Sequence, residues 1–333
     1  MKAAFINRYG GPEVVEIGDR PIPELGPYDL LVKVSAAGVN PVDYKIRDGM
    51  MKVLLDYDMP LTLGCELSGI VVKTGSKVSR FKVDDAIFSR LDKSRIGTFA
   101  EYAAVRENDV ALKPANLSHT EAASVPLAGL TAWQGLQDIA GLRAGQKVLI
   151  HAGSGGVGSF AIQLAKHIGA TVATTVSGKN ADLVRRLGAD IVIDYNTQRF
   201  EDELRDYDVV FDTVGGATQH RSFGVLKPGG ILVTITGIPT ANFFRHWGLP
   251  FWIQGFGFIK NFTASRLAKA RNVRFKFFLM QASGAQLSAI ASLLKSKTIV
   301  PVIDRIFPLD QTREALAYSE AGHSVGKVII QPT

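Results

Sequence analysis

Hydrophobic residues in the first 110 positions fall in short runs that alternate with turn residues. Such runs occupy positions 30–35, 69–73, 86–89 and 100–105, and a further one begins close to Met1. Glycine and proline separate them, as in Gly10-Gly11-Pro12 and Gly26-Pro27. Short strands punctuated in this way are typical of a compact β barrel or sandwich. We therefore predict an N-terminal β domain.

From about residue 120 the pattern becomes one of strands alternating with helices. Helical spacing over 120–135, 159–167 and 179–187 separates strand-like apolar runs at 147–151, 170–176, 191–194, 209–212 and 231–236. This alternation predicts βαβ units and a parallel sheet. Later strands are predicted at 273–281, 300–307 and 327–331, with helices at 284–297 and 311–321.

An aromatic-rich segment, 241–272, interrupts this rhythm. Its most apolar part is broken by Pro250, Gly255 and Gly257 and is too short to span a bilayer, which takes about 20 apolar residues. Three interpretations stay open: a helical cover packed on the sheet and a dimer partner, an apolar lid over hydrophobic substrates, and a peripheral membrane contact. The last is suggested by basic residues that flank the aromatic ones.

A glycine-rich turn links the run at 147–151 to the helix at 159–167. Gly153, Gly155 and Gly158 have the spacing of a dinucleotide-binding turn, and Gly156 and Val157 lie inside it. The first glycine allows the tight turn, the second lets the backbone approach a pyrophosphate, and the third lets helix and strand pack closely. The N-terminus of the helix favours phosphate. The alternative is a tight turn that binds nothing.

The choice of nicotinamide depends on the end of the next strand. NAD-binding proteins usually place Asp or Glu about 20 residues after the first glycine, on the ribose hydroxyls. Here that region holds Ser177, Lys179 and Asn180, and the first carboxylate is Asp182, inside the next helix. A hydroxyl, a cation and an amide suit a 2′-phosphate, so we predict NADPH. The alternative is an exposed loop in which Lys179 is merely solvated.

Composition adds limits on the class of protein. A chain of 333 residues suggests two domains. The net charge of +7 is spread without a long basic run, so we expect no nucleic-acid partner. A single cysteine, Cys65, excludes an internal disulfide and a cysteine-rich zinc site. The N-terminus lacks the apolar run of a signal peptide, and we expect a soluble cytoplasmic protein.

Several segments together resemble one family. They lie at 37–47, 63–69, 97–102, 127–133, 152–158, 187–195, 208–212 and 326–330. Over nearly its whole length the chain resembles the zinc-independent quinone oxidoreductases of the medium-chain dehydrogenase/reductase superfamily, and the alkenal, enone and quinone reductases in particular. The resemblance implies an α/β fold with a GroES-like β-barrel catalytic domain (1–120 plus 298–333). A Rossmann doubly wound parallel sheet (121–297) is inserted into it and carries the segment 241–272.

The resemblance also implies a site and an assembly. It implies an active site in the cleft between the domains and a homodimer formed through the strand at 273–281. Zinc-containing members carry a cysteine where this chain has Asn40 and a histidine where it has Cys65. The resemblance therefore implies chemistry without a metal.

Individual positions take roles by the same resemblance. Asn40, Tyr44 and Lys45 match a segment beside the nicotinamide and are the expected catalytic residues. The proton is expected from Tyr44, Lys45 or water, and Lys45 is also expected to reach the cofactor. The other matching positions are expected around the cofactor: Thr131 near the carboxamide, Tyr195 near the adenosine phosphate, Thr236 and Gly237 at a strand end, and Gly326 and Lys327 on the nicotinamide side.

Structural alternatives remain for some of these residues. Asp43 and Arg47, spaced i and i+4, are compatible with a helix-surface ion pair. The Thr131 hydroxyl is compatible with a bond to its own helix backbone, and Tyr195 with a half-buried packing role.

The predicted activity is NADPH-dependent reduction of a quinone or an α,β-unsaturated carbonyl compound without a metal. An enoyl-thioester reductase shares the same scaffold and is the rival enzyme. A non-catalytic regulatory protein that binds NADPH is the rival from another class. The sequence contains no motif specific to either rival.

Overall fold

The structure, a computed structural model, describes residues 1–332, and the chain divides into two compact units. One unit comprises Met1–Leu130 and Gln281–Thr333, and the other comprises Thr131–Met280. The boundaries differ from the predicted ones because helix α11 (Gly284–Lys295) packs on strand β8 (Val110–Leu112). The sequence pattern places that helix with the parallel sheet, whereas the structure places it with the β unit.

The first unit is built on antiparallel strands that the C-terminal segment completes. Its seven-stranded sheet has the order β15-β16-β3-β5-β6-β8, with β7 also paired to β3, and a smaller sheet has the order β2-β1-β4. The strands are β1 (Lys2–Ile6), β2 (Val15–Asp19), β3 (Asp29–Val39), β4 (Leu61–Thr62), β5 (Glu66–Thr74), β6 (Ala86–Arg90), β7 (Tyr102–Arg106), β8, β15 (Ile303–Pro308) and β16 (Lys327–Gln331).

Strand β16 carries the C-terminal segment into the middle of this sheet. It pairs with β3 in antiparallel register, Val328 opposite Val39, and with β15 in parallel register. Alternate residues of β3, such as Leu30, Val32 and Val34, are buried in one core. Such alternation is typical of a strand with one face in a core, and β3 contains the short apolar run predicted as a strand at 30–35.

Short helices complete the first unit. They are η1 (Pro12–Val14), α1 (Pro41–Arg47), η2 (Glu107–Asp109), α2 (His119–Ala123), α11, η5 (Leu309–Gln311) and α12 (Thr312–Glu320). Helix α3 (Pro126–Trp133) begins in the first unit and ends in the second. Helix α12 contacts α1 and β16, so it joins the two ends of the chain.

The second unit is a six-stranded, wholly parallel sheet in the order β11-β10-β9-β12-β13-β14. The strands are β9 (Lys147–Ile150), β10 (Thr171–Val176), β11 (Ile191–Asp194), β12 (Tyr207–Asp212), β13 (Leu226–Thr234) and β14 (Arg274–Phe277). Read in chain order this is the 3-2-1-4-5-6 arrangement of a Rossmann sheet. The predicted fold class is confirmed. The order reverses beside β9, the strand that leads into the glycine-rich turn.

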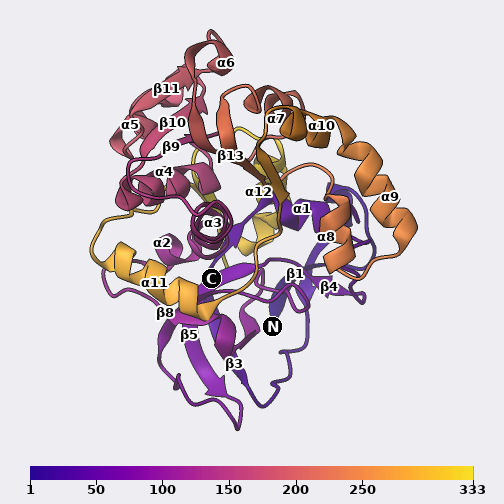
Figure 1. Cartoon of the computed structure of the whole chain (residues 1–333). Helices are drawn as coiled ribbons and strands as arrows, with labels where there is room; N and C mark the ends of the chain where they lie inside the picture. Colours follow the sequence, from indigo (N-terminus) through magenta and orange to yellow (C-terminus); the bar gives the residue numbers. More distant parts are fainter. Residues whose placement is uncertain (333) are drawn as a thin grey trace. The chain divides into compact units, whose positions relative to one another are not determined.

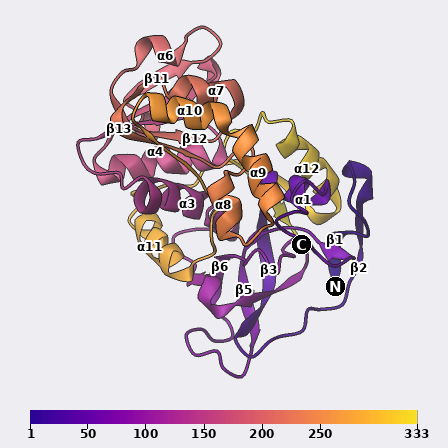
Figure 2. The same ribbon diagram turned by 45° about the vertical axis from the view of Figure 1, so that its right-hand side comes forward.

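Helices lie on both sides of the parallel sheet (Figures 1 and 2). The helices of this unit are η3 (Gln134–Ile139, a π-helix), α4 (Gly156–Ile168), η4 (Gly178–Asn180), α5 (Ala181–Arg186), α6 (Phe200–Glu203), α7 (Gly216–Ser222), α8 (Ala241–His246), α9 (Phe251–Lys260) and α10 (Phe262–Ala270). Helix α4 packs on β9 and β10, and α10 packs on β14 and α7. Within the described residues, no helix is long and apolar enough to cross a membrane.

Two predicted strands end early, for a common reason. The strand predicted at 231–236 ends at Thr234, and the one predicted at 273–281 ends at Phe277. Thr234 and Phe277 are register partners. A strand cannot extend the ladder beyond the last residue of its neighbour, so both stop together.

Candidate functional site

The glycine-rich turn leaves β9 through a strained residue. Ala152 has a φ of 51°, and the Gly153 N–H donates to the Thr175 carbonyl at 3.1 Å. A Cβ atom on Gly153 would lie 2.0 Å from Thr174 Oγ1, and one on Gly158 would lie 2.2 Å from the Ala152 carbonyl oxygen. These two positions therefore require glycine for packing, as the spacing predicts.

Gly155 is a glycine for a different reason. A Cβ atom there would meet nothing closer than the Ala152 oxygen at 3.4 Å, and its φ of −77° is open to any residue. Gly155 is also the N-cap of α4, without a side-chain cap and with no acidic residue in the first turn. An open approach to uncapped N–H groups is the geometry that a pyrophosphate needs.

The end of β10 lies against this turn. Asn180 Nδ2 lies 3.2 Å from Ser154 Oγ and 3.4 Å from Ser177 Oγ. Lys179, between them in sequence, is exposed. The structure thus brings Ser177 and Asn180 to the glycine turn, and Lys179 adds a solvent-facing cation beside them.

A carboxylate that the sequence pattern does not point to lies on the other side of the loop that follows β10. Asp194, the last residue of β11, is in register with Val176, and a Cβ atom on Gly178 would lie 2.5 Å from its Oδ2. Its other oxygen accepts from the Asn196 backbone N–H at 3.0 Å. Neighbouring parallel strands end at the same edge of a sheet, so the last residue of the third strand, β11, is expected to lie close to the end of β10. Tyr195, which follows it, is 60% exposed, and its predicted alternative as a half-buried packing residue is wrong.

The carboxyl ends of β12 and β13 are tied together by the buried Asp212. Its oxygens accept from the Gly215 N–H at 2.8 Å, from Gln219 Nε2 at 3.0 Å and from Thr234 Oγ1 at 3.0 Å. The Thr236 N–H in turn donates to Thr234 Oγ1 at 3.2 Å. This network holds Thr236 at the strand edge where the predicted cofactor site lies.

Gly237 and Thr131, two further predicted cofactor residues, differ in their surroundings. Gly237 has a φ of 82°, and nothing lies within 4 Å of its Cβ position. It is therefore an open turn position just beyond Thr236. Thr131 is buried in α3.

His151, which precedes the turn, is a structural residue. Its Nδ1 lies 3.0 Å from Thr175 Oγ1 and its Nε2 lies 2.8 Å from Ser222 Oγ. Complete burial lowers the pKa of this imidazole from 6.5 to about 4, against a smaller opposing effect of the Asp212 carboxylate. The side chain is neutral in the folded protein at neutral pH.

This depressed pKa predicts an acid-sensitive contribution to stability. The neutral imidazole contributes fully above pH 6.5, and the contribution is lost as the pH falls to about 4. A shift of this size corresponds to about 3 kcal/mol. We expect the difference in unfolding free energy between wild type and His151→Gln to shrink by about that amount between pH 7.5 and pH 4. Urea titrations at each pH measure it, and a difference independent of pH would contradict the prediction.

In the first unit, Glu66 and Lys327 form a buried ion pair at the end of β3. Lys327 Nζ lies 2.7 Å from Glu66 Oε1 and 3.0 Å from the Val39 carbonyl oxygen, and it also donates to Asn40 Oδ1. The other Glu66 oxygen accepts from the Leu127 N–H at 2.6 Å. Glu66 is 0% and Lys327 is 6% exposed. The pair therefore joins four segments that are distant in sequence.

Asn40 is fully engaged in the same cluster. Its Nδ2 donates to Glu66 Oε1 at 2.7 Å and to the Gly38 carbonyl at 3.3 Å. Its backbone N–H donates to Asp43 Oδ2 at 2.8 Å, which completes a capping box on α1. The side chain is buried and has no polar atom to spare for a substrate.

The predicted alternative of an ion pair between Asp43 and Arg47 is wrong. Asp43 caps α1, whereas Arg47 pairs with Asp48 at 2.7 Å and with Glu320 of α12 at 2.9 Å. Both Asp43 and Arg47 are buried rather than on the helix surface. Burial raises the pKa of the Asp43 carboxyl to about 6, although the Cys65 thiol and the Asn40 amide both lower it.

Tyr44 and Lys45 are half-buried residues of α1. Burial raises the pKa of the Tyr44 hydroxyl, and the Glu320 and Asp48 carboxylates raise it further. Burial lowers the pKa of the Lys45 ammonium, which forms no ion pair within the described residues. Burial therefore favours the neutral form of both side chains, the hydroxyl of Tyr44 and the amine of Lys45.

The remaining predicted position, Gly326, precedes β16. Its φ is 88°, and a Cβ atom would lie 2.4 Å from the Val302 carbonyl oxygen. Glycine is required there to direct Lys327 into the cluster with Glu66.

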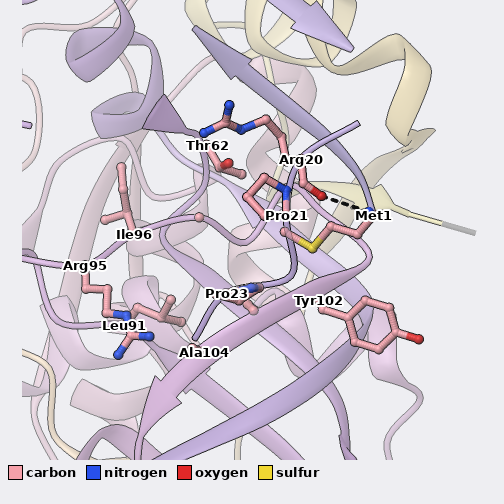
Figure 3. A pocket seen from close by; sticks show the side chains of 12 residues that line it. Met1, Arg20, Pro21, Pro23, Thr62, Leu91, Arg95, Ile96, Tyr102 and Ala104 are labelled. Carbon is pink, nitrogen blue, oxygen red and sulfur yellow. Dashed lines mark hydrogen bonds between the residues drawn. The ribbon is translucent and has the colours of Figure 1, made fainter. Parts of the chain in front are cut away.

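Two surface hollows lie apart from these residues. Figure 3 shows one of about 220 Å³ in the first unit, lined by Arg20, Pro21, Thr62 and Arg95 among others. Another, of about 440 Å³ in the second unit, is lined by four arginines and by Glu201, which forms ion pairs with two of them. Neither contains a predicted site residue. Within residues 1–332 no group of three or more His, Cys, Asp or Glu side chains is arranged to hold a metal ion. Cys65 is buried, and burial raises the pKa of its thiol well above its ordinary value.

Comparison with known proteins identifies relatives along the whole chain. Residues 26–115 match the alcohol dehydrogenase GroES-like domain, and residues 187–330 match the zinc-binding dehydrogenase family. The chain is 36% identical to 2-methylene-furan-3-one reductase of Solanum lycopersicum over 100% of its length and 79% of that protein. It is equally similar to the chloroplastic NADPH-dependent alkenal/one oxidoreductase of Arabidopsis thaliana, over 100% of its length and 80% of that protein.

Solved structures agree with these relatives. The quinone oxidoreductase from Coxiella burnetii superimposes with a TM-score of 0.87 and 33% identity, covering 100% of this chain and 99% of that one. The chain belongs to the quinone oxidoreductase and alkenal/one reductase family of the medium-chain dehydrogenase/reductase superfamily, a family of NAD(P)H-dependent oxidoreductases.

Proposed function

We propose that this protein uses NADPH to reduce a quinone or an α,β-unsaturated carbonyl compound, without a metal. The observation that carries the proposal is the turn at Gly153–Gly158, where Gly155 leaves the uncapped N-terminus of α4 open to a pyrophosphate. The names of the relatives support the substrate class, since they are reductases of an enone, of alkenals and of quinones.

The residues that surround the turn fit the phosphorylated nicotinamide. Ser177 and Asn180 supply a hydroxyl and an amide, and the exposed Lys179 supplies a cation for a 2′-phosphate. Asp194 faces the backbone of Gly178 from the other side, so Lys179 must outweigh its charge. We propose that Thr131, Gly156, Val157, Tyr195, Thr236 and Gly237 complete the cofactor site.

In the first unit we propose different roles for the residues that the resemblance assigns to the nicotinamide. The cofactor, when bound, supplies a hydride from C4 of its nicotinamide ring. Lys45 holds a proton or positive charge for the carbonyl oxygen that becomes an enolate. Asn40, Gly326 and Lys327 are positioning residues, because their polar groups are occupied within the protein.

A pair of variants tests the assignment of Lys45 against Tyr44. We expect Lys45→Met to lower kcat by about 100-fold, the usual contribution of a positioned acid. The matched variant Tyr44→Phe should change kcat by less than about threefold, because a hydroxyl with a raised pKa is a poor donor. The wild-type kcat should fall on the alkaline side as Lys45 loses its proton, and Lys45→Met should lose this limb. The reverse order of effects would contradict the assignment.

A substrate panel tests the function itself. Loss of nicotinamide absorbance is measured for NADPH and NADH with quinones, enones, alkenals and enoyl thioesters. We expect oxidation of NADPH with a quinone, an enone or an alkenal, and a clear preference over NADH. Turnover confined to enoyl thioesters would indicate the rival reductase, and tight NADPH binding without turnover would indicate a regulatory protein.

We also retain the predicted homodimer as a proposal. Strand β14 lies at an edge of the parallel sheet and has β13 as its sheet partner among the described residues. An open edge of this kind is a site where a second copy can pair. Sedimentation velocity at several concentrations measures the oligomeric state.

A further inference from the structure

Helix α9 (Phe251–Lys260) presents apolar side chains to solvent. Phe251 is 84% exposed, Ile259 70%, Trp252 65% and Phe258 58%. The residues that α9 buries are Ile253 and Gly257, against Phe244 of α8. Figure 1 shows α9 and α8 reaching away from the six-stranded sheet, to which α10 connects them, and Figure 2 shows the same arrangement.

The exposed residues form one continuous surface. Positions 251, 252, 255, 256 and 259 have the spacing i, i+1, i+4, i+5 and i+8, which places them on one side of a helix. Gly255, in their midst, has nothing within 4 Å of its Cβ position. We call this surface the aromatic face, and it comprises Phe251, Trp252, Phe256, Phe258, Ile259 and Phe262. Large contiguous apolar surfaces of this kind mark interaction sites.

The charge around the aromatic face has a single sign. Residues 213–303 contain no Asp or Glu at all. Helices α8 to α10 and the residue after them carry Arg245, Lys260, Arg266, Lys269 and Arg271, and all five are exposed. None of the five forms an ion pair within the described part of the chain. The segment that carries the aromatic face is therefore basic and contains no carboxylate of its own, although Arg271 lines a hollow together with Glu201.

We propose that the aromatic face docks this protein on a membrane surface that contains anionic lipids. Trp and Phe side chains enter the boundary between headgroups and acyl chains, and a rim of Lys and Arg adds attraction to anionic headgroups. Basic and aromatic side chains lie close together on this surface, since Lys260 Nζ is 5.7 Å from the centre of the Phe256 ring.

The charge argues against a second copy of this chain as the occupant. A two-fold dimer through the aromatic face would bring the same surface of both subunits together. The five basic residues of one copy would then face those of the other, and like charges across an interface are repulsive. An anionic lipid surface complements the same residues.

Vesicle binding tests the proposal on the full-length protein. We expect co-sedimentation with phosphatidylcholine vesicles that contain 30% phosphatidylserine, and at least tenfold weaker binding to vesicles of phosphatidylcholine alone. Replacing Phe251, Trp252 and Ile259 together by serine should weaken binding to the anionic vesicles at least tenfold. The triple variant Lys260→Gln, Arg266→Gln and Lys269→Gln should weaken it by a similar factor.

Matched variants control for general effects of polarity and charge. Ile22, Val83 and Leu112 are exposed apolar residues of the first unit, and their replacement by serine should leave binding within twofold of wild type. The same holds for Lys33→Gln, Lys73→Gln and Lys82→Gln, which remove the same charge elsewhere. Thermal unfolding midpoints show that each variant is folded.

Three outcomes would overturn the proposal. These are no binding of wild type to anionic vesicles, equal loss in the matched variants, and a serine variant that dissociates an oligomer without changing vesicle binding. The last would identify the aromatic face as a contact between protein chains. None of these readouts depends on enzyme turnover, so failure here is distinguishable from failure of the proposed function.

Discussion

Replacing Gly155 by alanine is expected to raise the KM for NADPH about 100-fold, a loss of ~2.7 kcal/mol of cofactor binding, while the protein stays folded. The φ of −77° at Gly155 suits alanine, and the added Cβ would have 3.4 Å to its nearest neighbour, an ordinary contact. The space that it fills is the one through which a pyrophosphate reaches the N–H groups of α4. Initial rates with varied NADPH, and the thermal midpoint, measure the two parts of this prediction.

Gly158→Ala is the matched control, because it adds the same methyl group three residues along the turn. Its Cβ would lie 2.2 Å from a backbone oxygen, so the turn itself must move and the thermal midpoint should fall. If Gly155→Ala bound NADPH as tightly as wild type, the turn would not be the pyrophosphate site. If Gly155→Ala lost as much stability as Gly158→Ala, the glycine at position 155 would be needed for packing and not for access of the pyrophosphate.

Removing one member of the buried pair Glu66–Lys327 is expected to destabilise the first unit severely. Lys327→Met leaves the Glu66 carboxylate, which is 0% exposed, without its cation. Breaking a buried ion pair in this way usually costs about 3–5 kcal/mol. Glu66→Gln should destabilise the protein as well, since it leaves the ammonium buried among Val39, Asn40 and an uncharged amide.

The double variant Glu66→Gln with Lys327→Met tests whether the pair itself is responsible. It removes both charges, so we expect it to lose clearly less stability than the sum of the single variants. Urea unfolding of the four proteins measures the coupling. Additive losses would show that the two residues act independently, which would contradict the pairing.

The sequence pattern predicted the second unit well because its determinants are local. The apolar run into β9, the glycines of the turn and the helix after them follow one another directly along the chain. Ser177, Lys179 and Asn180 were predicted as cofactor residues by counting from the same turn. Ser177 and Asn180 lie against that turn, and the cofactor role of all three stays a prediction. Each of these elements forms through contacts between neighbours in sequence, and such contacts are what periodicity reports.

The contacts of the first unit were harder to predict from the sequence, because the most important ones join distant segments. The pairing of β16 with β3 is needed to bring together residues 38–40, 66, 127 and 327. No residue spacing in the sequence predicts this pairing. The resemblance therefore implied a catalytic role for Asn40 and a cofactor contact for Lys327, although the structure uses their polar groups inside the protein. Asp194 was overlooked for a related reason, since it approaches Gly178 from a neighbouring strand. The exposure of the aromatic face is likewise a tertiary property, because an apolar helix is usually buried.

The most direct test of the proposed function traces the hydride itself. NADPH carrying deuterium at C4 of the nicotinamide, supplied as each of its two epimers, is incubated with the enzyme and an α,β-unsaturated ketone. Mass spectrometry then locates the label in the saturated product. We expect one epimer, and only one, to deliver deuterium to the β-carbon, while the proton at the α-carbon comes from solvent. Product without deuterium from either epimer, or no product at all with any enone or quinone supplied, would contradict it.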